Sequence, residues 1–162
     1  MFIFHLCYLM GEEVEKEIEC GLKVRINMKI CNATVIESPK AKGTVIIPRY
    51  VDHNNQKYKI ISLNKNAFNY NKIEFLTFPE DSEVETFKKK SFYFANIKKL
   101  RIPPNLKKLE DGWHNGIRDL TEIEISPKNK YFIYFNEEFL IGKSRTDIDK
   151  FDVLHIARYD IE

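Results

Sequence analysis

Apolar residues recur at regular intervals through the middle of this 162-residue chain. Three copies of one pattern begin at Ile73, Ile97 and Leu120, which are 24 and 23 residues apart. Each copy reads apolar, two spacers, apolar, one spacer, apolar, with a proline directly after it or one residue later. The last two apolar positions alternate as in a β-strand, and proline ends a strand because it cannot donate a ladder hydrogen bond. The pattern therefore predicts three short strands, and residues 45–48 contain an earlier, partial copy.

A second apolar pair lies near each strand, followed by a large aromatic residue that has a small residue before it. The pairs and their aromatics are Ile60/Leu63 with Phe68, Val84/Phe87 with Phe92, and Leu106/Leu109 with Trp113. One unit of about 23 residues cannot bury its own apolar face, but stacked units share a continuous core. The alternative is an ordinary antiparallel sheet, which would seldom repeat strand, proline, apolar pair and aromatic in register. We therefore expect a solenoid of about four coils.

The composition and the amino-terminal pattern agree with a mainly β protein. Ile, Phe and Tyr number 20, 12 and 8, whereas Ala occurs only five times, and this balance favours strands over helices. Val24, Ile26 and Met28 alternate with polar residues as in a half-buried strand. Cys31-Asn32 then turns the chain into a second expected strand. We predict a β cap over the open end of the first coil.

We expect one structural domain in three segments. Residues 1–20 are predicted to be a poorly ordered or loosely packed extension, residues 21–42 the β cap, and residues 43–162 the repeat solenoid. The apolar run Met1–Met10 lacks a preceding basic residue and a small-residue cleavage site, so it is a poor signal peptide. No apolar run approaches the roughly 18 residues of a membrane-spanning helix.

The repeat resembles the BspA-like leucine-rich repeats, whose unit runs from an aromatic residue to Leu-x-x-Ile-x-Ile-Pro and then Val-x-x-Ile. Ala67-Phe68, Ile102-Pro103 and Leu106-x-x-Leu109 match this unit, and the resemblance covers about residues 43–127. It implies a right-handed, curved solenoid that serves recognition and adhesion, often at cell surfaces. The first copy departs from the family pattern, because a long insert separates Pro48 from the next strand-ending proline. The resemblance favours a surface antigen-like protein, whereas the poor signal peptide favours the cell interior, so localisation stays open.

No catalytic or metal-binding signature is complete. Gly142-Lys143-Ser144 would end a phosphate-binding loop only with a glycine five positions before it, and Glu137 occupies that position. The four histidines show no zinc spacing with the cysteines, and the odd number of cysteines argues against a disulfide framework. Asp147 and Asp149 lack the glycine and further ligands of a calcium loop. We therefore expect no enzyme, no cofactor and no metal.

Charge is unevenly distributed although the chain carries only +2 overall. Nine lysines and arginines lie between Lys88 and Arg118, against only Glu110 and Asp111. This basic band could bind a polyanion or nucleic acid, which is the alternative function. Lysines also occur at solvated strand edges, where they block edge pairing. Because no aromatic platform for stacking bases is evident, nucleic acid is an unexpected partner.

A ligand-binding face follows from the strand pattern. If Leu100 and Ile102 point into the core, Lys99 and Arg101 point outward. Equivalent outward positions form two ladders, one of Ile46, Thr77, Arg101 and Glu124 and one of Phe75, Lys99 and Glu122. On the concave strand face we predict a ligand-binding strip, here called the strand-face strip, of Phe75, Thr77, Lys99, Arg101, Glu122 and Glu124. Its expected ligand is a protein or glycan; alternatively, Lys99/Glu122 and Arg101/Glu124 form ion pairs of about 0.2–1 kcal/mol.

Overall fold

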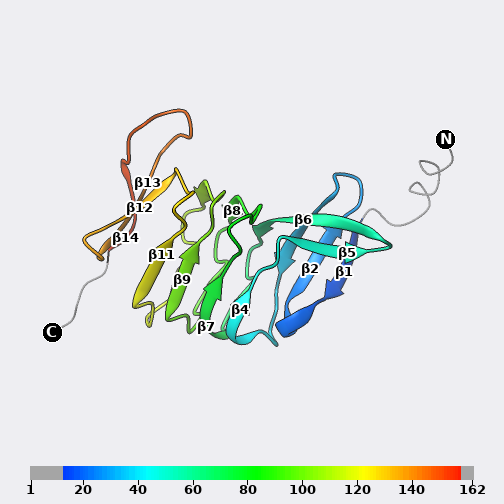
Figure 1. Cartoon of the computed structure of the whole chain (residues 1–162). Helices are drawn as coiled ribbons and strands as arrows, with labels where there is room; N and C mark the ends of the chain where they lie inside the picture. The colour runs from blue at the N-terminus through cyan, green and yellow to red at the C-terminus, as the bar shows by residue number, and fades with distance from the viewer. Residues whose placement is uncertain (1–12, 158–162) are drawn as a thin grey trace.

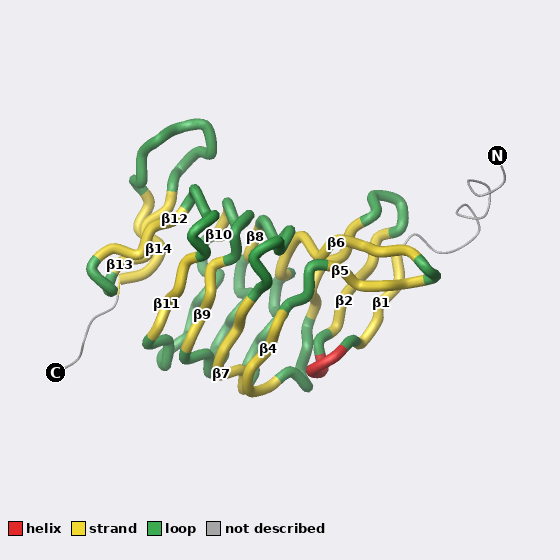
Figure 2. The backbone as a smooth tube through the Cα atoms, in the orientation of Figure 1, coloured by secondary structure: helices red, strands yellow, loops and turns green. Residues whose placement is uncertain are grey.

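Three sheets make up residues 13–157, the part of the chain that this computed structural model describes, and two of them form facing walls of stacked strands (Figures 1 and 2). The apolar run Met1–Met10, weighed above as a signal peptide, lies outside the described residues. Apart from the 3-10 turn η2 (Glu19–Gly21), the described elements are all strands. The described chain contains no helix long and apolar enough to cross a membrane.

Sheet B holds the strands predicted from the repeat. It consists, in spatial order, of β11 (Glu122–Ile125), β9 (Lys99–Ile102), β7 (Lys72–Thr77) and β4 (Lys42–Ile46). Every neighbouring pair in this sheet is parallel, so the chain passes once around the solenoid between one strand and the next. The predicted mainly β solenoid of about four coils is confirmed.

Sheet A forms the opposite wall and continues into the amino-terminal cap. It contains β1 (Glu13–Glu17), β2 (Lys23–Asn27), β3 (Asn32–Ile36), β5 (Tyr50–His53), β6 (Gln56–Leu63), β8 (Thr86–Phe87) and β10 (Lys108–Leu109). β1, β2 and β3 pair antiparallel, whereas β3, β6, β8 and β10 pair parallel. The cap therefore covers the sheet A edge of the first coil by adding strands to that sheet.

The long insert after the first copy is a β-hairpin. β5 and β6 pair antiparallel from Tyr50↔Lys59 to His53↔Gln56. The two residues between them, Asn54 and Asn55, both have a positive φ of 50° and 60°. Two-residue hairpin loops of this kind need a left-handed backbone at both positions, and asparagine tolerates it better than most residues.

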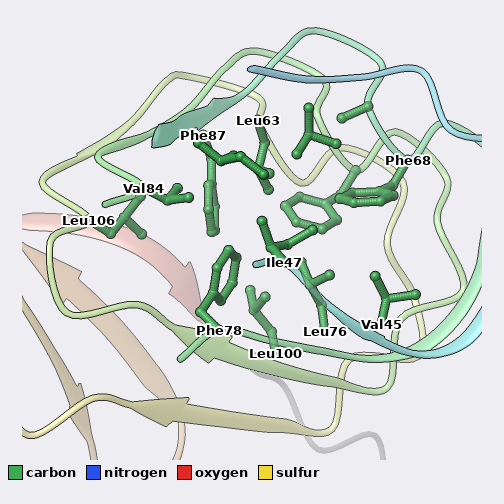
Figure 3. Close-up of a cluster of buried hydrophobic side chains, with 14 of the residues drawn as sticks. Val45, Ile47, Leu63, Phe68, Leu76, Phe78, Val84, Phe87, Leu100 and Leu106 are labelled. Carbon is green, nitrogen blue, oxygen red and sulfur yellow. The ribbon is translucent and has the colours of Figure 1, made fainter. Parts of the chain in front are cut away.

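The core lies between the two sheets and a third wall of stacked turns (Figure 3). Sheet B contributes Leu76 and Leu100, and sheet A contributes Leu63 and Phe87, all fully buried. The predicted aromatic column is buried too, comprising Phe68, Phe92 and Trp113. Phe92 lies 5.5 Å from Phe68 and 5.7 Å from Trp113, measured between ring centroids. The aromatic residue of each coil therefore packs on that of the next coil, as the repeat predicted.

Backbone hydrogen bonds between successive coils hold the third wall. Phe68 N donates to Ser91 O at 2.8 Å, and Phe92 N donates to Trp113 O at 3.0 Å. One turn position has a positive φ in three successive coils, at Tyr70, Phe94 and Gly116. Only glycine adopts this conformation without steric cost, so Tyr70 and Phe94 hold it under strain. Their exposed rings stack at a centroid distance of 5.5 Å.

An antiparallel sheet follows the last parallel strand. It is formed by β12 (Phe132–Phe135), β13 (Phe139–Gly142) and β14 (Val153–Ala157). Phe132 and Leu140 are buried in the main core, so this sheet packs on the end of the solenoid. It lies inside the predicted solenoid segment, residues 43–162, and β1 lies inside the predicted loose extension. The domain boundaries themselves stay a prediction.

Candidate functional site

The outer face of sheet B brings the strand-face strip together in two adjacent rows. Phe75 is paired in register with Lys99, and Lys99 with Glu122. Along the second row, Ile46 pairs with Thr77, and Arg101 pairs with Glu124. The side chains of these two rows alternate along the strands with the buried residues, as the outward assignment required. The role of these residues in binding a ligand stays a prediction.

Lys99 is the electrostatic centre of the strand-face strip. Its Nζ lies 2.7 Å from Glu122 Oε1, 2.6 Å from Glu124 Oε1, and 5.0 Å from the centroid of the Phe75 ring. Hydrogen bonds to Glu122 and then Glu124 raise the pKa of Lys99, and the hydrogen bond from Lys99 lowers the pKa of Glu124. Lys99 and Glu124 therefore remain charged near neutral pH. The Lys99–Glu122 ion pair anticipated from the sequence is present.

Glu124 stands beside Arg101 in the ladder, but the acid that Arg101 pairs with is Glu80. Its guanidinium forms an ion pair with Glu80, which lies in the loop after β7. Glu80 Oε2 also accepts a hydrogen bond from Ser126 Oγ at 2.8 Å, and the Glu80 carbonyl accepts one from Lys128 Nζ at 3.3 Å. Glu80 thus links three successive coils and fixes Arg101 at the border of the strip.

The basic band between Lys88 and Arg118 is partly neutralised by acids, most of them from neighbouring coils. Besides Lys99 and Arg101, Lys107 pairs with Glu85 at 2.7 Å. Weaker pairs, at 4.0 and 3.9 Å, join Lys98 to Glu74 and Lys108 to Glu110. Five of the nine basic residues therefore have an acidic partner in the folded chain. A charge count along the sequence misses this, because most of these acids lie outside the band.

Two histidines within residues 13–157 have a shifted pKa. His114 and His155 are partly buried, and burial is the main cause that lowers the pKa of each. The structure packs His114 against Trp113 and His155 against Phe132. Within residues 13–157, no group of three or more histidine, cysteine, aspartate or glutamate side chains could hold a metal ion. Cys20 and Cys31 are exposed free thiols.

A second surface, which the sequence analysis missed, lies on the outer face of sheet A. A hollow of about 440 Å³ crosses this face, and we call it the polar trough. It is defined by Glu13, Arg25, Asn27, Ile30, Asn32, Thr34, Ile61, Ser62, Asn64, Glu85, Thr86, Lys88, Lys108 and Glu110. None of these residues belongs to the strand-face strip. The sequence does contain a sign of this surface, because a polar residue stands just before each of Leu63, Phe87 and Leu109. The side chains of these three apolar residues point into the core, so the residue before each one faces outward.

Two solved structures are similar to this chain over part of their length. The chain resembles the pneumococcal vaccine antigen PcpA, with a TM-score of 0.54 and 12% identity over 75% of this chain and 40% of that structure. A leucine-rich cell surface protein from Faecalibacterium prausnitzii also matches, with a TM-score of 0.40 and 12% identity over 72% of this chain and 44% of that one. The chain thus spans less than half the length of either structure. Among the curated proteins there is no significant match.

The sequence also matches a family model directly. The model of the BspA type leucine-rich repeat region finds six copies, which extend over residues 51–144. These residues include β6 to β10 in the two walls of the solenoid, together with the aromatic turns between them. The matched region is more than half of the chain. The chain therefore belongs to the BspA-type leucine-rich repeat family.

Proposed function

We propose that this chain is a non-enzymatic recognition module that binds a protein ligand through the strand-face strip. The observation that supports this most is the pair of rows across four parallel strands. Each row contains one apolar residue, Ile46 or Phe75. On β9 and β11 each row continues with a basic residue and then an acidic one. Adjacent rungs are about 4.8 Å apart, so one ligand surface can contact several of them. Aromatic and arginine side chains are the residues that most often dominate protein–protein binding energy.

The charges of the strip suit binding better than catalysis. A general acid or base works best when its pKa lies near the operating pH. Lys99 is instead held protonated by two carboxylates, and Glu124 is held ionised by Lys99. Such fixed charges steer and orient a protein partner of complementary charge. By analogy with the pneumococcal vaccine antigen, we extend the proposal to a surface antigen-like role.

Charge substitutions on the strip test the proposal. Lys99→Gln with Arg101→Gln removes both positive rungs, and we expect at least a tenfold loss of affinity for the protein captured by the intact chain. Lys130→Gln with Lys150→Gln, two exposed lysines away from the strip, is the matched control and should bind normally. Affinity is measured by surface plasmon resonance after capture and identification of the partner. Equal affinity of the two double variants would contradict the assignment.

The alternative function, polyanion binding through the band between Lys88 and Arg118, predicts a different salt response. A protein that neutralises several phosphates loses affinity steeply as salt rises, whereas a mixed-charge protein interface loses it less. The ion pairs from Lys98, Lys99, Arg101, Lys107 and Lys108 reduce the charge available to a polyanion. Binding of heparin or single-stranded DNA that exceeds protein binding, and that is lost at high salt, would favour the alternative.

A further inference from the structure

The polar trough has a floor of short polar side chains between long charged ones. Register places Arg25, Thr34, Ser62, Thr86 and Lys108 in one row across five neighbouring strands. The three middle positions carry hydroxyl groups on short side chains, and the two ends carry long basic side chains. This order explains why the sheet surface is hollow at its centre. With strands about 4.8 Å apart, the row is about 19 Å long.

Hydrogen-bonding groups of both kinds line the trough. Thr34 Oγ1 and Ser62 Oγ lie 2.9 Å apart, so one hydroxyl donates to the other and each keeps a further lone pair for a ligand. Within residues 13–157, the Thr86 hydroxyl and the Lys88 ammonium have no hydrogen-bonding or ion-pair partner. Asn64 also lines the trough, and because its Oδ1 accepts from the Lys65 backbone N–H, its two amide protons remain as donors for a ligand.

The charge of the trough is balanced. The charged residues that line it are Arg25, Lys88 and Lys108 against Glu13, Glu85 and Glu110. A polyanion site needs an excess of positive charge, which this lining does not offer. The core of a protein–protein interface is enriched in aromatic residues and poor in charged ones, whereas the described lining contains six charged residues and no aromatic one. Pockets for apolar small molecules are lined mainly by hydrophobic side chains, and here only Ile30 and Ile61 are hydrophobic.

We propose that the polar trough binds a neutral oligosaccharide that lies across the strands of sheet A. Each sugar hydroxyl donates and accepts hydrogen bonds, as do the threonine and serine hydroxyls of the floor. The three basic and three acidic side chains that line the trough offer further donors and acceptors to a ligand without net charge. This site lies on the wall opposite the strand-face strip and goes beyond the proposed protein binding.

Wild-type protein on a glycan array that carries neutral, sulfated and sialylated oligosaccharides tests this proposal. We expect binding to neutral members, with affinity then measured by calorimetry using the neutral oligosaccharide that gives the strongest signal. Thr34→Ile with Thr86→Ile fills the floor and removes two hydroxyls, and it should lower that affinity at least tenfold. Thr86→Ser keeps the hydroxyl and should bind within about twofold of wild type. Circular dichroism melts check that each variant is folded. If the double variant does not fold, the single change Thr86→Ile replaces it.

Matched changes on the other wall separate this site from the proposed protein site. Thr77→Ile makes the same substitution on a strand of sheet B, and Lys99→Gln with Arg101→Gln disables the strand-face strip. Both should leave oligosaccharide binding unchanged. Three results would overturn the proposal. The wild type could bind no neutral glycan, it could bind only sulfated or sialylated glycans, or Thr77→Ile could lose as much oligosaccharide affinity as the floor variant. None of these outcomes bears on the protein affinity of the strip, which is measured separately.

Discussion

Phe87→Ala is expected to lower the free energy of unfolding by about 3–5 kcal/mol, because it removes a large buried ring and leaves a cavity. The Phe87 ring is fully buried, and its centroid lies 5.5 Å from Phe92 and 5.9 Å from both Phe78 and Trp113. These neighbours come from two walls and two successive coils, so the loss loosens packing in several directions. Urea denaturation measures it, with the fluorescence of Trp113, the only tryptophan in the chain, as the probe.

Phe75→Ala is the matched control for this prediction. Phe75 is the same residue type on sheet B, but its ring is only half-buried and lies on the outer face beside Lys99. Substitutions at such positions usually change stability by about 0.5 kcal/mol, and the lost contact with Lys99 adds to this only modestly. Equal destabilisation by the two variants would show that the assignment of inner and outer faces is wrong.

Leu100→Ala is expected to cost about 2–5 kcal/mol, through the lost transfer free energy and the cavity left behind. Leu100 is fully buried on β9, between β7 and β11, so it supports the coils on both sides. In a solenoid, stability comes from such contacts between neighbouring units, and a break at the centre weakens both halves. Thermal and urea melts monitored by circular dichroism give the size of the effect.

The neighbouring variant Arg101→Ala provides the comparison. Arg101 lies on the outer face, and its side chain keeps about 29% of its accessible surface while paired with Glu80. Ion pairs that are partly open to water contribute about 0–1 kcal/mol, so Arg101→Ala should remain folded. A chain that tolerates Leu100→Ala but unfolds with Arg101→Ala would mean that the strand faces are inverted, and the strand-face strip with them.

The sequence was sufficient to predict the solenoid because several linked features repeat together. The strand pattern, its proline, the second apolar pair and the aromatic recur with nearly constant spacing, and stacking places equivalent positions in register. This is why the inward position of Leu100 and the column through Phe92 could be predicted from one chain. The same register brought Lys99 beside Glu122, as observed.

The features that were missed depend on loops and on strands too short to show a period. β8 and β10 have two residues each, so alternation could not reveal that Thr86 and Lys108 face outward into a trough. The pairing of Arg101 with Glu80 depends on the path of the loop after β7, which has no repeat. The apolar runs after Pro127 indicate the short strands β12–β14, but their antiparallel pairing has no coil-like signature, because its register is set by hairpin turns rather than by stacking.

Site-specific photo-crosslinking shows whether a protein ligand contacts the outer face of sheet B. The photoreactive residue p-benzoylphenylalanine is placed at Thr77 within the strand-face strip, or at Lys150 in the exposed loop between β13 and β14 as a control. After irradiation with the captured partner, we expect a covalent adduct from position 77 and none from position 150. Adducts from position 150 alone, with none from position 77, would contradict it.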